Sequence, residues 1–159
     1  MNKLENIDDA HFLFGSIPVL ANRMDTLMDR ALQKYGVTSK QWLLSIILHS
    51  LFEAPPTIKE AAREMGSSHQ NVKQVALKLQ KKGLVRLEKD KKDARATRIR
   101  LTEASEAFWA QSNSEGDAFM EAFYRGIAPV NLHSARVVLE KLLENLNDIE
   151  KDFREDETE

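Results

Sequence analysis

Residues 57–102 read TIKEAAREMGSSHQNVKQVALKLQKKGLVRLEKDKKDARATRIRLT, and this stretch decides the fold that we expect. Thr57 is followed three residues later by Glu60, which is the pattern of a helix that opens with a capping box. Gly66-Ser67-Ser68 then ends this short helix and caps a longer one, because glycine favours helix ends and serine favours helix starts. The longer helix, which ends at Gly83, has four apolar residues on one face: Val72, Val75, Ala76 and Leu79. We therefore expect a helix-turn-helix.

The hydrophobic period changes after Gly83. Residues 84–88 and 97–101 alternate apolar and polar side chains, which is typical of strands, and the polar residues 89–96 between them are typical of a loop. We therefore expect a β-hairpin directly after the second helix. A helix-turn-helix followed by such a hairpin is a winged helix-turn-helix, which binds duplex DNA with its second helix in the major groove.

Helices are also expected before this stretch. Apolar residues recur at helical spacing from about Asp8 to Tyr35, and Pro18 should either kink this helix or mark its true start. Another helix should begin at Thr38 or Ser39, which are good N-cap residues, and stop at Ala54-Pro55-Pro56.

Two more helices are expected after the hairpin. Thr102 should cap the first of them, which we expect to bend at Gly116. Asn131 should cap the last helix, which carries an apolar stripe of Leu132, Leu139, Leu142, Leu146 and Ile149. The apolar surface of this stripe is larger than a single small lobe can cover, so we expect the terminal helices to build a homodimer.

The composition supports a mainly α fold with a small β-hairpin wing. The 159 residues include only 6 Gly and 4 Pro, which disfavours a turn-rich sandwich or barrel. We expect a DNA-binding lobe at residues 38–102, a helical dimerisation lobe made of 1–37 with 103–153, and a disordered acidic tail at 154–159.

The charge is distributed unevenly. Residues 67–100 contain 11 basic and 3 acidic residues, a local charge of +8, although the whole chain has a net charge of −2. The rest of the chain therefore carries −10. A cationic segment in an otherwise acidic protein indicates a surface for a polyanion, although a solvated charged face is the simpler alternative.

The second helix of the motif supplies the candidate base-reading residues. Gln70, Asn71 and Gln74 lie near its start, and Gln and Asn suit the hydrogen-bonding edge of adenine. The neighbouring candidates for phosphate contact are Ser68, His69, Lys73 and Lys78. In the wing the candidate DNA-binding residues are Lys91, Lys92, Asp93, Arg95 and Arg98. Ordinary exposed helix and loop residues would show the same pattern, so the adjoining wing is what favours DNA binding.

From about Thr38 to Thr102 the sequence resembles the MarR family of transcriptional regulators. The resemblance is carried by LQKKGLVR at residues 79–86 and by a wing in which Asp90, Asp93 and Arg95 lead to IRLT at 99–102. The family pattern Asp-Arg-Arg is changed here, because Ala94 occupies its middle position. The resemblance implies that Arg95 enters the DNA minor groove and that Asp93 steadies it.

A small aromatic or phenolic effector is a further expected partner. Large apolar side chains could line its pocket between the DNA-binding lobe and the outer helices, or they could be plain core: Met24, Met28, Trp42, Phe52, Phe108 and Trp109.

Several other classes are disfavoured. The chain has no Cys, and its four His residues lack metal-ligand spacing, so we expect no cofactor and no metal. No pair of catalytic residues stands out, so we expect that the protein is not an enzyme. The sequence has no apolar run of 18 residues and no signal peptide, so we expect a cytoplasmic protein without a membrane partner. A protein-binding winged-helix adaptor is the main alternative, but such an adaptor has no need of the +8 segment.

Overall fold

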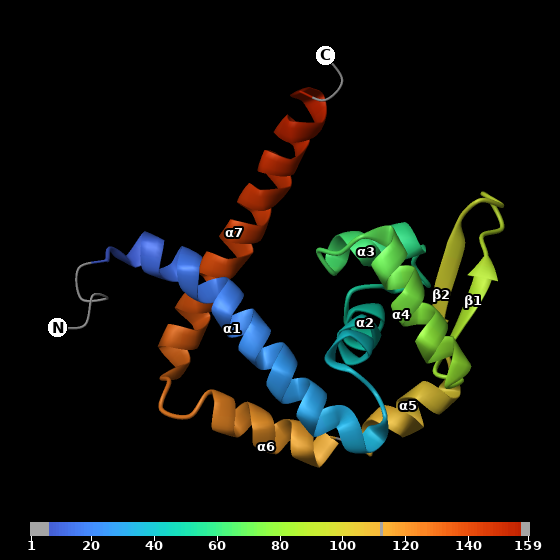
Figure 1. The fold of residues 1–159 in the computed structure, drawn as a ribbon, viewed down its shortest axis with the longest axis horizontal. Coiled ribbons are helices and arrows are strands. Elements are labelled where there is room, and N and C mark those ends of the chain that lie inside the picture. The colour runs from blue at the N-terminus through green and yellow to red at the C-terminus, as the bar shows by residue number, and fades with distance from the viewer. Residues whose placement is uncertain (1–6, 112, 157–159) are drawn as a thin grey trace. The chain divides into compact units, whose positions relative to one another are not determined.

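The computed structural model describes residues 7–111 and 113–156. The chain divides into two compact units, residues 1–111 and residues 112–159. The helices of the first unit are α1 (Asp9–Leu32), the short 3-10 helix η2 (Gln33–Tyr35), α2 (Ser39–Ser50), α3 (Ile58–Glu64), α4 (His69–Lys81) and α5 (Glu103–Ala110), and its strands are β1 (Val85–Lys89) and β2 (Thr97–Leu101). The second unit contains α6 (Asn113–Phe123) and α7 (Pro129–Asp156). The prediction of a mainly α fold with a hairpin wing is confirmed (Figure 1).

The start of the short helix α3 follows the local sequence signal. The Thr57 hydroxyl oxygen accepts a hydrogen bond from the Glu60 N–H at 3.2 Å, and the Glu60 carboxylate accepts one from the Thr57 N–H at 2.6 Å. This reciprocal pair satisfies two backbone donors that no helical carbonyl can reach. Gly66 follows α3 with a φ of 56° and Gly83 follows α4 with a φ of 73°, a left-handed conformation that glycine adopts without steric cost.

The two strands form one antiparallel sheet in the expected region. Val85 pairs with Leu101 and Lys89 with Thr97, so the two strands are paired along their whole lengths. A third segment joins its edge, because the Ile99 N–H donates to the Pro56 carbonyl at 2.8 Å and Thr57 pairs with Arg98. The segment between α2 and α3 therefore fixes the position of the wing.

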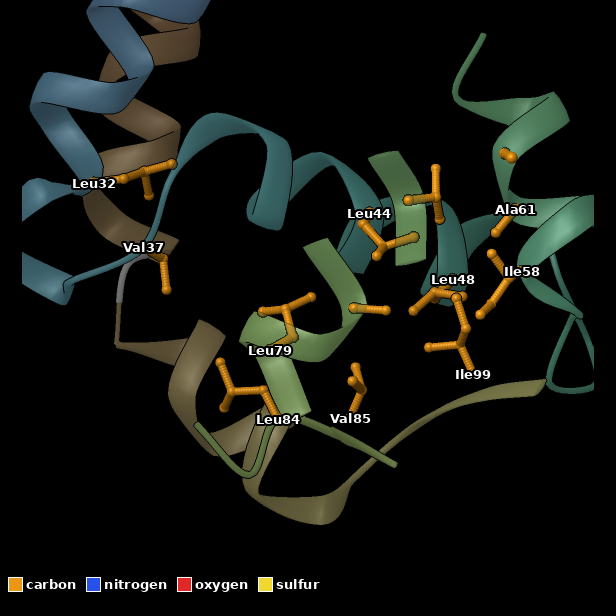
Figure 2. Close-up of a cluster of buried hydrophobic side chains, with 13 residues drawn as sticks. Leu32, Val37, Leu44, Leu48, Ile58, Ala61, Leu79, Leu84, Val85 and Ile99 are labelled. Atoms are coloured by element: carbon orange, nitrogen blue, oxygen red, sulfur yellow. The ribbon is translucent and has the colours of Figure 1, made fainter. Parts of the chain in front are cut away.

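The core of the first unit is formed where α2, α3, α4 and the hairpin meet (Figure 2). Leu44, Ala61 and Leu79 are completely buried, and Ile58 and Ile99 nearly so. Burial of a large aliphatic side chain contributes about 1.5–3 kcal/mol, so this shared core holds the helix-turn-helix and the base of the wing together.

One helix begins about where it was expected and another does not. α1 begins at Asp9 and continues through Pro18, so Pro18 does not mark its start, and the Asp8 carboxylate caps the helix by accepting hydrogen bonds from the Ala10 and His11 N–H groups. α7 begins at Pro129 rather than after Asn131, because proline has no N–H to satisfy and suits the first helical position.

The helix expected from Thr102 through a bend at Gly116 is two helices, α5 and α6. Gln111 ends α5, and Gly116 lies inside α6. The Thr102 hydroxyl does not cap α5 but donates to the Gly83 carbonyl at 2.7 Å, and so it joins the end of β2 to the turn after α4.

α7 extends to Asp156, so residues 154–156 are helical although we expected a disordered tail from 154 onward. Residues 157–159 of that expected tail lie outside the described residues. None of the described helices is long and apolar enough to cross a membrane.

Candidate nucleic-acid interface

The helix α4 presents one polar face and buries the other. Val72, Ala76 and Leu79 are completely buried, whereas the polar residues between them are exposed. The exposed set contains every predicted site residue of this helix and its cap: Ser68, His69, Gln70, Asn71, Lys73, Gln74 and Lys78. The structure thus brings these seven residues onto one accessible surface.

The N-terminus of α4 is arranged to favour an anion. The Ser68 hydroxyl oxygen accepts a hydrogen bond from the Asn71 N–H at 3.2 Å, and the first turn has no acidic residue. The remaining N–H groups of the first turn and the helix dipole therefore leave a partial positive charge where the side chains of His69 and Gln70 are exposed.

The wing loop is organised by Asp90. Its Oδ1 atom accepts hydrogen bonds from the backbone N–H groups of Lys92 and Asp93, at 2.6 and 2.8 Å, and its Oδ2 atom forms an ion pair with Arg98 Nε. The Asp90 carboxylate is only 6% exposed. The backbone donors, led by the Asp93 N–H, and the Arg98 guanidinium lower the pKa of Asp90 to about 2, so the residue is ionised at neutral pH.

The tip of the wing exposes Arg95. The Asp93 Oδ1 atom accepts a hydrogen bond from the Arg95 backbone N–H at 2.9 Å, and the Ala96 N–H donates to the Asp93 carbonyl at 2.9 Å. Asp93 therefore fixes the backbone from which the Arg95 side chain extends. Lys91 and Lys92 are exposed in the same loop.

Arg98 is a predicted site residue whose guanidinium group is bound to acceptors within the protein. Besides the ion pair with Asp90, its Nη1 atom donates to the Pro55 carbonyl at 2.6 Å. Two of its nitrogen atoms are thus bound to internal acceptors, while the side chain remains 37% exposed.

This arrangement of two helices, wing and exposed cations coincides with a known family. Residues 35–96 match the model of the MarR family. The winged-helix region of this chain is therefore similar to that of the MarR family. The matched region runs from the end of η2 through both helices of the helix-turn-helix to the end of the wing loop.

Several solved structures share the fold along most of the chain. A MarR/EmrR family transcriptional regulator from Acinetobacter sp. ADP1 is 18% identical, with a TM-score of 0.76 over 89% of this chain and 99% of that one. S. aureus MepR in a complex with DNA is 16% identical, with a TM-score of 0.71 over 88% and 99%. The organohalide-sensing regulator RdhR-CbdbA1625, in its 2,4-dichlorophenol-bound form, is 19% identical, with a TM-score of 0.72 over 91% and 85%.

Sequence reasoning missed the central role of Asp90. We noted the residue in the wing pattern but did not expect it to hold the loop. A signal was present, because an aspartate followed by two polar residues and a second aspartate is typical of a side chain that accepts from N–H groups two and three residues later.

The residues expected to line an effector pocket fall into two groups. Met28, Trp42, Phe108 and Trp109 pack against the core of the first unit, and the Phe108 and Trp109 rings meet edge to face with centroids 4.8 Å apart. Met24 and Phe52 are partly buried but are not among the side chains that pack against that core. Four of the six residues therefore pack against the core of the first unit.

No group of three or more potential metal-ligating side chains occurs among the residues that the structure describes.

Proposed function

We propose that this chain is a MarR-family, sequence-specific transcriptional regulator that binds duplex DNA. The observation that carries the proposal is the exposed polar face of α4 beside a wing loop whose hydrogen bonds present Arg95. A helix of this kind fits the major groove of B-form DNA, which is about 12 Å wide, and a cationic side chain suits the electronegative minor groove. The family match at residues 35–96 and the DNA complex of MepR support the same reading.

We propose further that the chain acts as a homodimer on a pseudo-palindromic site. A two-fold dimer places two recognition helices about 34–36 Å apart, so that they enter successive major grooves on one side of the duplex. Repression is the simplest consequence, because a bound dimer blocks access of other proteins to the same DNA. The regulator would work in the cytoplasm, with the DNA that it controls.

A protein-binding adaptor is the competing function, and the salt dependence of DNA binding separates the two. Each contact between a basic side chain and a phosphate releases counterions. We expect about four or five such contacts per protomer, and so about eight to ten per dimer. Each contact should add about −0.9 to the slope of log affinity against log salt concentration. Fluorescence anisotropy with a duplex of random sequence, at a series of salt concentrations, measures this slope. A slope near zero would contradict the proposal.

Two variants test which part of the surface meets DNA. Arg95→Ala removes an exposed cation at the wing tip, whereas Lys81→Ala removes an exposed cation from the last turn of α4. We expect the larger loss of affinity for Arg95→Ala, because its side chain extends from a loop fixed for groove entry. Equal losses would indicate diffuse electrostatic attraction instead of a defined contact.

We also propose a small aromatic effector near Met28, Trp42, Phe108 and Trp109. The support is the aromatic and Met-rich packing of these side chains and the dichlorophenol-bound form of the similar RdhR structure. A tenfold loss of DNA affinity requires only about 1.4 kcal/mol of coupling between the two sites. Titration of tryptophan fluorescence with simple phenolic acids tests this binding. A flat signal at millimolar ligand, or an unchanged response of folded Trp42→Ala protein on DNA, would contradict it.

A further inference from the structure

The Arg98 side chain joins two segments that are far apart in the sequence. Its Nη1 atom donates to the carbonyl of Pro55, 43 residues earlier, at 2.6 Å, and its Nε atom is bound to the Asp90 carboxylate. The backbone follows the same path, because the Ile99 N–H donates to the Pro56 carbonyl at 2.8 Å. Side chain and strand together fasten the wing to the segment between α2 and α3.

A continuous series of hydrogen bonds leads from Arg98 to the wing tip. Asp90, which pairs with Arg98, also accepts from the N–H groups of Lys92 and Asp93. Asp93 in turn accepts from the Arg95 N–H at 2.9 Å. Arg98 therefore holds Asp90, Asp90 holds the Asp93 backbone, and Asp93 holds the backbone of Arg95.

The other end of this series reaches the helix-turn-helix. Pro55 lies two residues before Thr57, which caps α3. The hydroxyl and the N–H group of Thr57 both donate to the Glu60 carboxylate. These two donors, with a smaller contribution from the Arg98 charge, lower the pKa of Glu60. One short segment thus fixes both the start of α3 and the base of the wing.

We propose that Arg98 is a positioning residue that sets how the wing presents Arg95 beside α4, and that it does not itself contact DNA. This inference rests on the proposed DNA-binding function. The guanidinium group suits the task because its planar, rigid arrangement of N–H donors reaches the Asp90 carboxylate and the Pro55 carbonyl at the same time. The ammonium group of a lysine carries the same charge but lacks this geometry.

A double-mutant cycle on DNA affinity separates positioning from contact. We expect Arg98→Ala to weaken binding about tenfold in the unmodified chain but less than about twofold in an Arg95→Ala background, because residues that act through one contact are not additive. Two residues that each touched phosphate would show losses that multiply. Multiplying losses would therefore overturn the proposal.

Arg100→Ala is the matched control. Arg100 lies on the same strand and is exposed, and its Nε atom pairs with the Glu88 carboxylate at 3.3 Å. We expect its loss of affinity, whatever its size, to be the same in both backgrounds. Arg98→Lys should remain several-fold weaker than the unmodified chain, and full recovery by lysine would show that charge alone is sufficient and would contradict positioning.

Amide hydrogen exchange provides a measurement that needs no DNA. We expect the Lys92 and Asp93 N–H groups to exchange faster in Arg98→Ala, and to be unchanged in Arg100→Ala, because only the first variant releases Asp90. If the unmodified chain bound no duplex DNA, the proposed function would fail, but the exchange rates would still decide whether Arg98 holds the wing. Unchanged exchange in Arg98→Ala would overturn the inference.

Discussion

At the scale of single residues, Asp90 shows how one nearly buried carboxylate can organise a loop. Its pKa of about 2 lies below its ordinary value of 3.8, so its interactions stabilise the folded wing at neutral pH. This contribution is present above pH 3.8 and is lost as the pH falls toward 2. The acid form cannot pair with the Arg98 guanidinium as the carboxylate does.

We therefore expect Asp90→Asn to destabilise the protein by an amount that depends on pH. The difference in unfolding free energy between the unmodified chain and the variant should be constant above about pH 5 and should shrink at lower pH. Urea unfolding between pH 3 and pH 7 measures it. Asp93→Asn, which changes an exposed carboxylate of the same loop, should cost less stability at pH 7. A pH-independent difference for Asp90→Asn would contradict the assignment.

Gln70 and Asn71 belong to the same scale, because each is expected to read a single base pair. Both are exposed in the first turn of α4. We expect Gln70→Ala and Asn71→Ala to change sequence preference, since loss of a bidentate contact costs about 1–3 kcal/mol at its own base pair. Selection of binding sites from random duplexes, with the unmodified chain and each variant, makes the comparison. An unchanged consensus with lower total affinity would mean that these residues contact the DNA backbone.

At the scale of elements, α3 depends strongly on its cap. It has only seven residues, and a helix this short is unstable in isolation. We expect Thr57→Ala to lower the free energy of unfolding by about 1 kcal/mol, because it removes the hydroxyl that accepts from the Glu60 N–H. Thr57→Ser should retain most of the stability. Urea unfolding checks both variants.

Thr26→Ala is the control for this change. The Thr26 hydroxyl donates to the Asn22 carbonyl within α1 and caps nothing, so its removal should cost less than about 0.5 kcal/mol. If Thr26→Ala and Thr57→Ala lowered the free energy of unfolding equally, the capping box would contribute no more to stability than an ordinary hydroxyl group within a helix.

At the scale of the whole molecule, the exposed apolar residues predict self-association. In α1 the Phe14 side chain is 83% exposed, and in α7 Leu143 and Phe153 are 61% and 66% exposed. Each helix thus displays apolar surface that a monomer seldom leaves in water. We expect sedimentation equilibrium at micromolar protein to give a particle of twice 18.1 kDa.

The apolar stripe of α7 can be tested directly. Leu142 and Leu146 are both exposed and lie four residues apart on one face of the helix. The double variant Leu142→Asp/Leu146→Asp should shift the sedimenting species toward the monomer, whereas Asn147→Asp, an acidic change at a polar position, should not. A purely monomeric unmodified chain would remove the dimer and, with it, the palindromic operator.

The sequence by itself determined the features that depend on near neighbours along the chain. The capping box of Thr57 and Glu60, the turn at Gly66 and the alternation of the two strands all involve residues no more than a few positions apart. Such interactions leave a pattern that can be read directly. The uneven distribution of charge can also be read from the sequence alone. It identifies the candidate DNA-binding surface on α4.

Only the tertiary structure decided the roles that depend on distant partners. Arg98 looked like another exposed cation of the wing, but its acceptors are Asp90, eight residues earlier, and Pro55, 43 residues earlier. Thr102 looked like a helix cap, but its hydroxyl bonds to Gly83, 19 residues away. A side chain with several possible partners takes the one that packing places within reach, and packing follows from the whole core rather than from local spacing.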